Sequence, residues 1–190
     1  KHLEAICDEM IRRGLGTKTG WWAYQRPDTV NERLIAKFRE AGGYAIGFGV
    51  ESAVESVRDG VDKGYKQECI HRVRELCRKH GVSFGCNLIF GLPDDTLDTM
   101  EQTLQLAFEL LPEYLNLYSC MAYPGSPLYD QVSKEHPEWL PDSWIGYSQH
   151  HYETKPLPTK HCTAAEVLRF RDEAWKRYHT SDSYLNMMRS

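Results

Sequence analysis

The sequence predicts an α/β fold built around a parallel sheet, and two observations support this prediction. Four short apolar runs alternate with three segments whose apolar residues recur at helical spacing. The runs contain few polar residues, which is typical of strands that are buried on both faces. Because strand–helix–strand connections are right-handed, these units form either a doubly wound sheet or part of a (β/α) barrel.

The first elements are short and clearly separated. Residues 1–14 are expected to form a helix, and a helix at the very start suggests a piece of a longer protein. Residues 21–25 form a short aromatic strand. Thr29 and Glu32 make a capping box that predicts the start of the second helix. Residues 44–50 are apolar and too few for a helix, so we expect a buried strand there.

The same alternation continues through the middle of the chain. Residues 66–80 are expected to form a helix that ends at Gly81, and residues 82–90 form the third strand. Another helix is expected over residues 97–111. The last strand of the predicted sheet then covers residues 114–121.

The remainder of the chain has a different composition. Residues 131–162 place four prolines among aromatic side chains, so we expect an irregular strap over the core. The aromatic residues argue against disorder. Thr163 and Glu166 form a capping box that predicts a final helix, whereas the polar tail from Thr180 is expected to fray.

Length and charge exclude several classes of protein. With 190 residues, 41% of them hydrophobic, the chain can bury a core without disulfides or metals. The net charge is −4 and both signs are interspersed, so we do not expect a nucleic-acid partner. The sequence has no apolar run of about 18 residues and opens with no signal peptide. We therefore expect a cytoplasmic protein without a membrane span.

The cysteine pattern predicts buried, reduced thiols. The six cysteines stand at positions 7, 69, 77, 86, 120 and 162. No two of them form a CxxC pair, and none has zinc-finger spacing with a histidine. We expect neither a disulfide framework nor a metal site made from this chain alone.

The candidate site lies where the predicted strands end, because ligands of parallel α/β folds bind at the carboxyl ends of the strands. Arg26 follows the first strand, and Glu51 and Ser52 follow the second. A carboxylate in this position suits a ribose diol or an ammonium group, since it can accept two hydrogen bonds. The alternative is that Glu51 caps the next helix or pairs with an arginine.

Two rigid turns follow the other strands. After the third strand, Gly91 allows a close approach of the backbone to a flat ligand, and Pro93 stiffens the turn. An ordinary strand–helix loop with a good cap would look the same. Residues 123–127 form a similar turn after the last strand.

Taken in order, these segments resemble one protein family. The segments are Trp22-Ala23-x-x-Arg26, Phe48-Gly49-Val50-Glu51-Ser52, Lys63-Gly64, Ile89-Phe90-Gly91-Leu92-Pro93 and Tyr123-Pro124-Gly125-Ser126-Pro127-Leu128-Tyr129. Their order and spacing resemble the radical S-adenosylmethionine (SAM) superfamily. The similarity is greatest to its cobalamin-domain branch, which includes the anaerobic magnesium-protoporphyrin ester cyclases. The resemblance covers about residues 1–130.

The resemblance implies a six-stranded partial (β/α) barrel, of which residues 1–130 would supply the last four strands. Residues 131–190 would be a C-terminal extension, the strap and helix. The resemblance implies that Glu51 and Ser52 contact the ribose or methionine end of SAM. It implies that adenine is bound by Ile89, Gly91 and Asp94 and is flanked by Tyr123, Pro124 and Gly125. Arg26 is a further implied cofactor-binding residue. Lys63, Arg72 and Arg74 are cationic candidates for the methionine carboxylate, unless they belong to a solvated helix face.

One feature of the family is absent. Its CxxxCxxC loop, whose thiolates hold a [4Fe–4S] cluster, does not occur in this sequence. The resemblance therefore implies the C-terminal piece of a radical SAM enzyme, inactive alone, with the cluster loop and any cobalamin domain upstream. The parent enzyme would cleave SAM to a 5′-deoxyadenosyl radical. Methyl transfer and oxidative cyclisation of a small-molecule substrate both stay open, as do the catalytic residues.

Two other classes of function also stay open. The chain could be a complete small α/β enzyme, although no histidine lies at a predicted strand end. It could also be a non-catalytic scaffold module. If the chain is instead a barrel without its first strands, residues 21–25 would leave an exposed sheet edge, through which we expect self-association.

Overall fold

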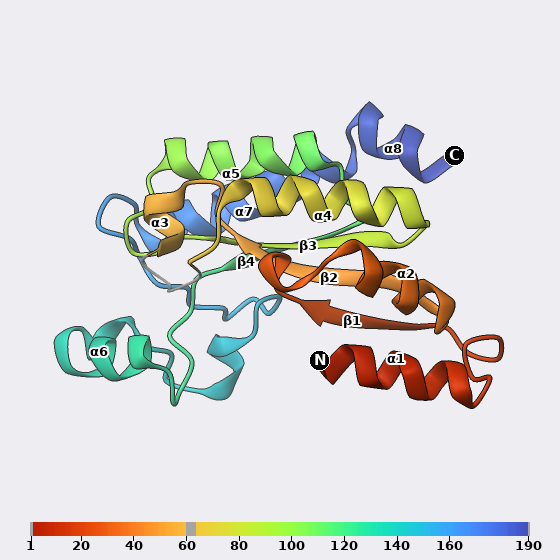
Figure 1. Ribbon diagram of the computed structural model, residues 1–190. Coiled ribbons are helices and arrows are strands. Elements are labelled where there is room, and N and C mark those ends of the chain that lie inside the picture. Colours follow the sequence, from red (N-terminus) through yellow and green to blue (C-terminus); the bar gives the residue numbers. More distant parts are fainter. Residues whose placement is uncertain (1, 60–63, 190) are drawn as a thin grey trace.

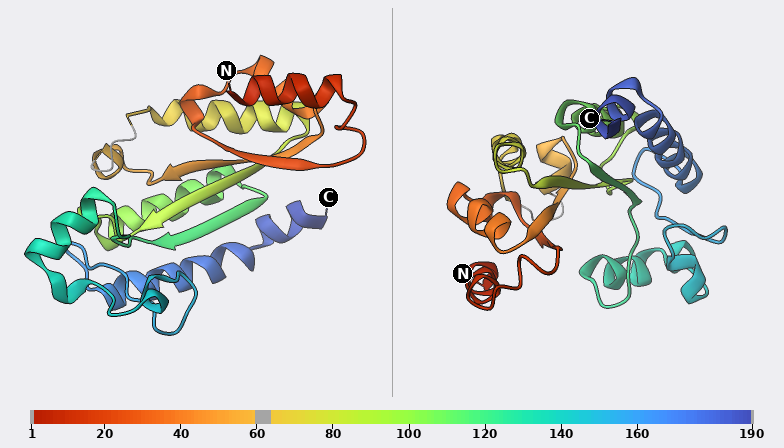
Figure 2. Two further views of the ribbon diagram at one scale, coloured as in Figure 1. Left: turned by 90° about the horizontal axis from the view of Figure 1, so that it is seen from below. Right: turned by 90° about the vertical axis from the view of Figure 1, so that its right-hand side faces the viewer.

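A parallel four-stranded sheet forms the centre of the molecule (Figure 1). The computed structural model describes residues 2–59 and 64–189. The strands are β1 (Trp21–Gln25), β2 (Gly43–Glu51), β3 (Ser83–Phe90) and β4 (Tyr114–Ser119), in that order across the sheet. In the right-hand view of Figure 2 they follow an arc, with helices on its outer side. This arrangement confirms the predicted α/β fold as part of a (β/α) barrel.

Helices connect the strands and cover the outer side of the arc. The helices are α1 (His2–Arg12), α2 (Glu32–Glu40), α3 (Glu55–Asp59), α4 (Gln67–His80), α5 (Leu97–Leu110), α6 (Pro127–Glu135), α7 (Ala164–His179) and α8 (Asp182–Arg189). Successive strands are joined through α2, then α3 and α4, then α5, as right-handed crossovers require. Helix α7 returns to pack against β3, β4 and α5. No helix of the described residues is long and apolar enough to cross a membrane.

The core lies between the sheet and the outer helices. Alternate strand residues such as Ile46, Phe48 and Phe84 are fully buried against Ile35 and Ile70 of the helices. We call the other face of the sheet the inner face. The prediction of strands buried on both faces is confirmed for β2 and β3, in which only Tyr44 is exposed, and is wrong for β1 and β4, in which exposed residues alternate with less exposed ones. Glycines at positions 47, 49 and 85 made the runs look apolar, but they carry no side chain to bury on the inner face.

The start of α2 differs from the prediction. Asn31 caps the helix, and its Oδ1 accepts a hydrogen bond from Leu34 N at 2.9 Å. The expected Thr29–Glu32 capping box is wrong, because Thr29 lies in a 3₁₀ turn (Pro27–Thr29) and donates to the carbonyl of Arg26. At α7 the predicted box of Thr163 and Glu166 is confirmed.

The C-terminal part contains more helix than the sequence indicated. Ser126 caps α6, which begins with Pro127 and extends into the segment expected to be irregular. Two 3₁₀ turns, Pro137–Trp139 and Trp144–Tyr147, follow. The tail forms α8 instead of fraying, because the ring of Tyr184 packs 5.2 Å from that of Tyr178. Helix α6 lies at the carboxyl ends of the strands (Figures 1 and 2).

Arg74 anchors the opposite end of the sheet. Its guanidinium is buried and donates to the carbonyls of Leu110 and Leu111 and to the Glu113 carboxylate, at 2.7–2.9 Å. These contacts close the end of α5 where Leu111 has a left-handed φ of 46°. Arg74 therefore fixes the start of β4, away from the carboxyl ends. Lys63 lies outside the described residues.

The free edge of β1 leads to a prediction about assembly. Among the described residues, β1 has one strand neighbour, β2, so its other edge keeps backbone groups without a strand partner. We expect the chain to self-associate through residues 21–25, which light scattering should show as a mass that rises with concentration. Amide exchange along this strand should slow as the mass rises. A monomer at high concentration with fast exchange in β1 would contradict the prediction.

Candidate functional site

The carboxyl ends of the strands bring several predicted site residues to one rim. Burial raises the pKa of Tyr118, and the nearby Tyr24, Tyr123 and Glu51 raise it further. These groups come from β1, β2, β4 and the turn after β4, so the curved sheet brings the two outer strands to the same site. Parallel strands end at the same edge of a sheet, which explains the convergence.

Glu51 ends β2 in an unusual backbone conformation. Its φ is 65°, in the left-handed region that side chains other than glycine rarely adopt. The register between β2 and β3 shifts between Gly49 and Glu51, which marks a bulge. The residue is only 8% exposed. A non-glycine residue in such a conformation costs about 1–3 kcal/mol, so neighbouring contacts must hold it.

Tyr65 and Arg58 supply those contacts. The Tyr65 hydroxyl donates to the carbonyl of Gly49 at 2.5 Å and lies 3.2 Å from that of Val50. Arg58 donates to the carbonyls of Ser52 at 3.1 Å and Tyr65 at 2.9 Å. Its guanidinium also lies 5.0 Å from the centre of the Tyr65 ring. We call this pair the β2 clamp.

The clamp is deeply buried. Arg58 has no exposed surface, and its Nε has no hydrogen-bond partner among the described residues. Burial also raises the pKa of the Tyr65 phenol far above its usual value, so the hydroxyl stays a donor. The guanidinium of Arg26 lies 5.8 Å from the same ring. No sequence pattern linked Tyr65 or Arg58 to the end of β2, because both lie beyond the strand along the chain.

Ser52 faces the protein interior. It is fully buried, and its Oγ lies 3.2 Å from Thr103 Oγ1 on α5 and accepts from Val54 N at 3.2 Å. Its hydroxyl thus fixes the segment between β2 and α3. The predicted role of Ser52 in cofactor binding stays a prediction.

The turn after β3 is organised by a carboxylate that the sequence analysis passed over. Asp95 is 1% exposed, and its Oδ2 accepts from Gly91 N at 3.0 Å and Leu92 N at 2.9 Å. Its Oδ1 accepts from Thr99 Oγ1 at 2.7 Å, while burial raises its pKa. By contrast, the predicted Asp94 lies at the surface and pairs with Lys160. Adjacent aspartates look alike in a sequence, and only packing distinguishes them.

Gly91 is required by close packing at this turn. Its φ is 80°, and a Cβ there would lie 2.5 Å from Val167 Cγ1 of α7. The structure therefore places Gly91 between the rim and α7. Ile89, two residues earlier, lies on the inner-face side of β3 by alternation with the buried Phe90.

The segment after β4 folds back onto the rim through Gln149. This side chain accepts from Ser119 N at 3.0 Å and donates to Ser119 O at 2.9 Å, as a neighbouring strand would. It also donates to the Tyr123 hydroxyl at 3.2 Å, which in turn donates to the carbonyl of Tyr147. The turn with Pro124 and Gly125 is thereby fastened beside β4. Nothing in the sequence singled out Gln149.

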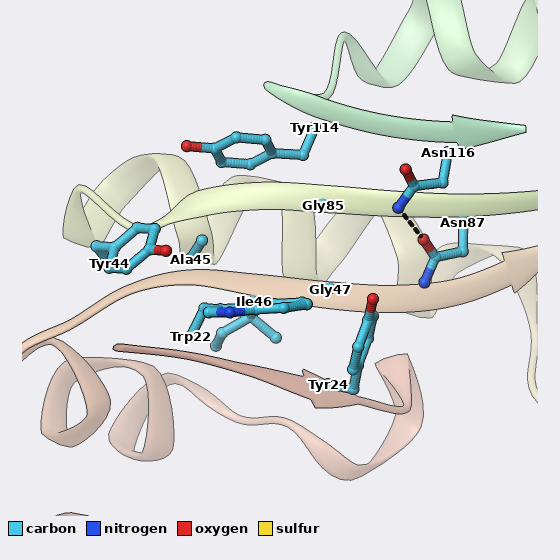
Figure 3. Close-up of a pocket in the computed structure, with 10 residues that line it drawn as sticks. All are labelled: Trp22, Tyr24, Tyr44, Ala45, Ile46, Gly47, Gly85, Asn87, Tyr114 and Asn116. Carbon is cyan, nitrogen blue, oxygen red and sulfur yellow. Dashed lines mark hydrogen bonds between the residues drawn. The ribbon is translucent and has the colours of Figure 1, made fainter. Parts of the chain in front are cut away.

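A hollow runs along the inner face towards this rim. One cavity of about 250 Å³ is lined by Trp22, Tyr24, Tyr44, Ala45, Ile46, Gly47, Gly85, Asn87, Tyr114 and Asn116 (Figure 3). A second is lined by Tyr24, Gln25, Arg26, Thr29, Gly49 and Asn87. Because Tyr24 and Asn87 line both, the two cavities are neighbours, and we call them together the hollow; Arg26 lines the second one.

The cysteines do not fit an iron–sulfur cluster. All except Cys69 are buried, and none is paired in a disulfide. Burial raises the pKa of Cys7, and it raises that of Cys77 and of Cys120 to about 12, so these thiols stay protonated. In the part of the chain that the structure describes, no three cysteine, histidine or acidic residues lie close enough to hold a metal.

Reconstitution tests this conclusion. Incubated anaerobically with iron and sulfide, the chain should not take up a [4Fe–4S] cluster, because no three of its described cysteines converge on one point. Iron analysis and visible absorbance measure the uptake. Stoichiometric iron with cluster absorbance, lost when any one of the cysteines is replaced, would contradict it.

The β2 clamp leads to a stability prediction. Tyr65→Phe removes the hydroxyl that serves two buried carbonyls, so it should lower the free energy of unfolding by about 1–3 kcal/mol. Chemical denaturation measures the change. Tyr152→Phe is the matched control, because Tyr152 is fully exposed. Equal stability of the two variants would show that the clamp is not needed.

Comparison with known proteins gives consistent results. Residues 3–107, more than half of the chain, match the family described as the Radical SAM superfamily. An uncharacterized methyltransferase of Pyrococcus horikoshii is 30% identical over 60% of this chain. The anaerobic magnesium-protoporphyrin IX monomethyl ester cyclase of Cereibacter sphaeroides is 26% identical over 86% of it. The matches span 25% and 26% of the length of these relatives.

A solved structure shows a similar fold. The radical S-adenosylmethionine methyltransferase TsrM of Kitasatospora setae, with cobalamin and a [4Fe–4S] cluster bound, superposes with a TM-score of 0.64. The two chains are 18% identical, and the superposition covers 88% of this chain and 34% of TsrM. At this identity the likeness concerns the fold of the sheet and its helices.

Proposed function

This chain belongs to the radical SAM superfamily, and from this membership we propose that it forms the SAM-binding rim and the inner wall of a radical enzyme's active site. The observation that carries the proposal is Glu51, a nearly buried carboxylate held at the rim by the β2 clamp. A carboxylate can accept two hydrogen bonds, so its place at the strand end suits a ligand with hydroxyl or ammonium donors.

The chemistry of the rim residues supports SAM as the ligand. In our proposal the Glu51 carboxylate accepts hydrogen bonds from the ribose hydroxyls or the ammonium group, and Ile89 and Gly91 present backbone to the adenine. Asp95 keeps that turn rigid. Tyr123, Pro124 and Gly125 flank the base, in a turn that Gln149 fastens to β4. Arg26 closes the rim beside β1.

The cluster would come from cysteines outside this chain. SAM and a reduced [4Fe–4S] cluster together supply a carbon radical that removes a hydrogen atom from a substrate. This chain's share is to orient SAM at the rim and to shield the substrate along the inner face. The substrate would be a small organic molecule. The proposal covers methyl transfer and oxidative cyclisation, because the relatives include a methyltransferase and a cyclase. It also covers a cobalamin cofactor, as in the TsrM structure.

Calorimetric titration of the chain with SAM tests the proposal. We expect saturable binding, which Glu51→Gln should weaken by about 1.5–3 kcal/mol, the scale of a lost charge-assisted hydrogen bond. The free energy of unfolding should stay nearly unchanged. Glu109→Gln is the matched control, because Glu109 is an exposed residue of α5 whose carboxylate lies 3.8 Å from His71 Nδ1.

Two results would contradict the proposal. If Glu51→Gln lowers stability by a few kcal/mol while SAM binds unchanged, Glu51 is a structural residue. If the unsubstituted chain binds no SAM, the alternative of a scaffold module is supported instead.

A further inference from the structure

The inner face carries a feature that SAM binding at the rim leaves unused. We propose that its hollow binds a flat, uncharged, conjugated ring system that has hydrogen-bonding groups on its edge. The inference rests on the proposed function, since such a ring would be the substrate. Four properties of the hollow support it: its walls, its floor, its amide groups and its lack of charge.

The walls of the hollow are aromatic. Trp22 and Tyr24 project from β1, Tyr114 projects from β4, and Tyr44 stands near the start of β2 (Figure 3). Their exposed fractions are 52%, 56%, 53% and 42%. Large aromatic surface of this kind is stabilised by contact with another ring, stacked or edge-on.

The floor is made of glycine backbone and one ring. Gly47 and Gly85 are register partners on β2 and β3, and both face the hollow. A Cβ at Gly47 would lie 2.6 Å from the Tyr24 ring, so this ring packs directly against Gly47, and a Cβ at Gly85 would lie 3.1 Å from Gly47 Cα. A side chain at either position would have to displace a neighbour, so the floor keeps a flat surface. A planar ligand can lie over Gly85 and against the Tyr24 ring, whereas a bulky, branched one would leave gaps.

The edge of the hollow carries an amide pair. Asn116 Nδ2 donates to Asn87 Oδ1 at 2.8 Å (Figure 3). This bond uses one donor and one acceptor of the two side chains. In either orientation of the amides, one oxygen and one NH₂ group remain for a ligand. The pair therefore suits a ring that offers both an acceptor and a donor.

The first cavity of the hollow lacks ionised groups. None of the residues that line this cavity of about 250 Å³ is acidic or basic. Arg26 lines the second cavity, and Glu51 ends β2. A charged ligand would lose hydration here without a compensating partner, so the occupant is neutral where it lies on the floor. Along β2, Gly47 and Glu51 are roughly 13 Å apart at ~3.3 Å per residue. A ring of ordinary size on this floor therefore extends towards the rim.

Fluorescence titration with lumichrome tests the inference. Lumichrome is a neutral, planar tricycle with N–H and C=O groups on its edge. We expect saturable binding, weakened about fivefold or more by Tyr114→Ala and by Asn116→Ala. Tyr152→Ala is the matched control, because Tyr152 is fully exposed and does not line the hollow. Anthracene-9-carboxylate, planar but anionic, should bind at least tenfold more weakly.

Three outcomes would overturn the inference. The first is that lumichrome does not bind, for example because another copy of the chain covers the inner face. The second is equal binding to Tyr114→Ala, Asn116→Ala and Tyr152→Ala. The third is equal affinity for lumichrome and the anionic ring. SAM titration of the same variants separates the two proposals, because a chain that binds SAM but not lumichrome refutes this inference alone.

Discussion

The geometry of the rim depends on a buried arginine and a tyrosine that hold the end of one strand. Glu51 closes β2 with a φ of 65°, a conformation that an isolated chain would leave. Tyr65 fixes the two carbonyls before it, and Arg58 fixes the carbonyl after it. Because the clamp holds the backbone on both sides of Glu51, the backbone of this residue keeps its conformation. A buried guanidinium is tolerated only with such partners, so the interaction fixes Arg58 as firmly as it fixes the strand.

The second constraint is that the large apolar side chains of the sheet pack on its outer face. Helices α2, α4, α5 and α7 provide the apolar cover on the outer side. Stability is thus supplied from one side, and the inner face is left to glycines, aromatic rings and amides. This division explains how one short sheet can be both a rigid support and a binding wall. It also explains why the C-terminal segment returns to the rim, where Gln149 and Tyr123 close the end of β4.

Local patterns were sufficient to predict most elements. The strand at 21–25 and the helix that ends at Gly81 lie where periodicity and the glycine placed them. The capping signal failed at Thr29 because Asn31, two residues on, made the better cap. Helix α8 was missed because its stability comes from contact between Tyr184 and Tyr178, which no local pattern reveals.

The site was predicted less completely than the fold. Glu51 was found because a carboxylate after an apolar strand stands out. The rim's long-range contacts could not be read from the sequence: Arg58 and Tyr65 act on a strand end some residues earlier, and Gln149 pairs with Ser119 thirty residues away. Asp95 was passed over for Asp94, since only burial separates the two. Roles predicted for single residues at the rim are therefore best tested through their contacts.

Hydrogen–deuterium exchange with and without saturating SAM tests the central claim most directly, because it locates the ligand without a substitution. Our account predicts slower exchange at the ends of β2 and β3 and in the turn after β4, over residues 49–53, 89–95 and 123–126. Exchange in α1 and α8 should not change. Protection confined to α1 and the amino ends of the strands, at verified saturation, would contradict the assignment of SAM to this rim.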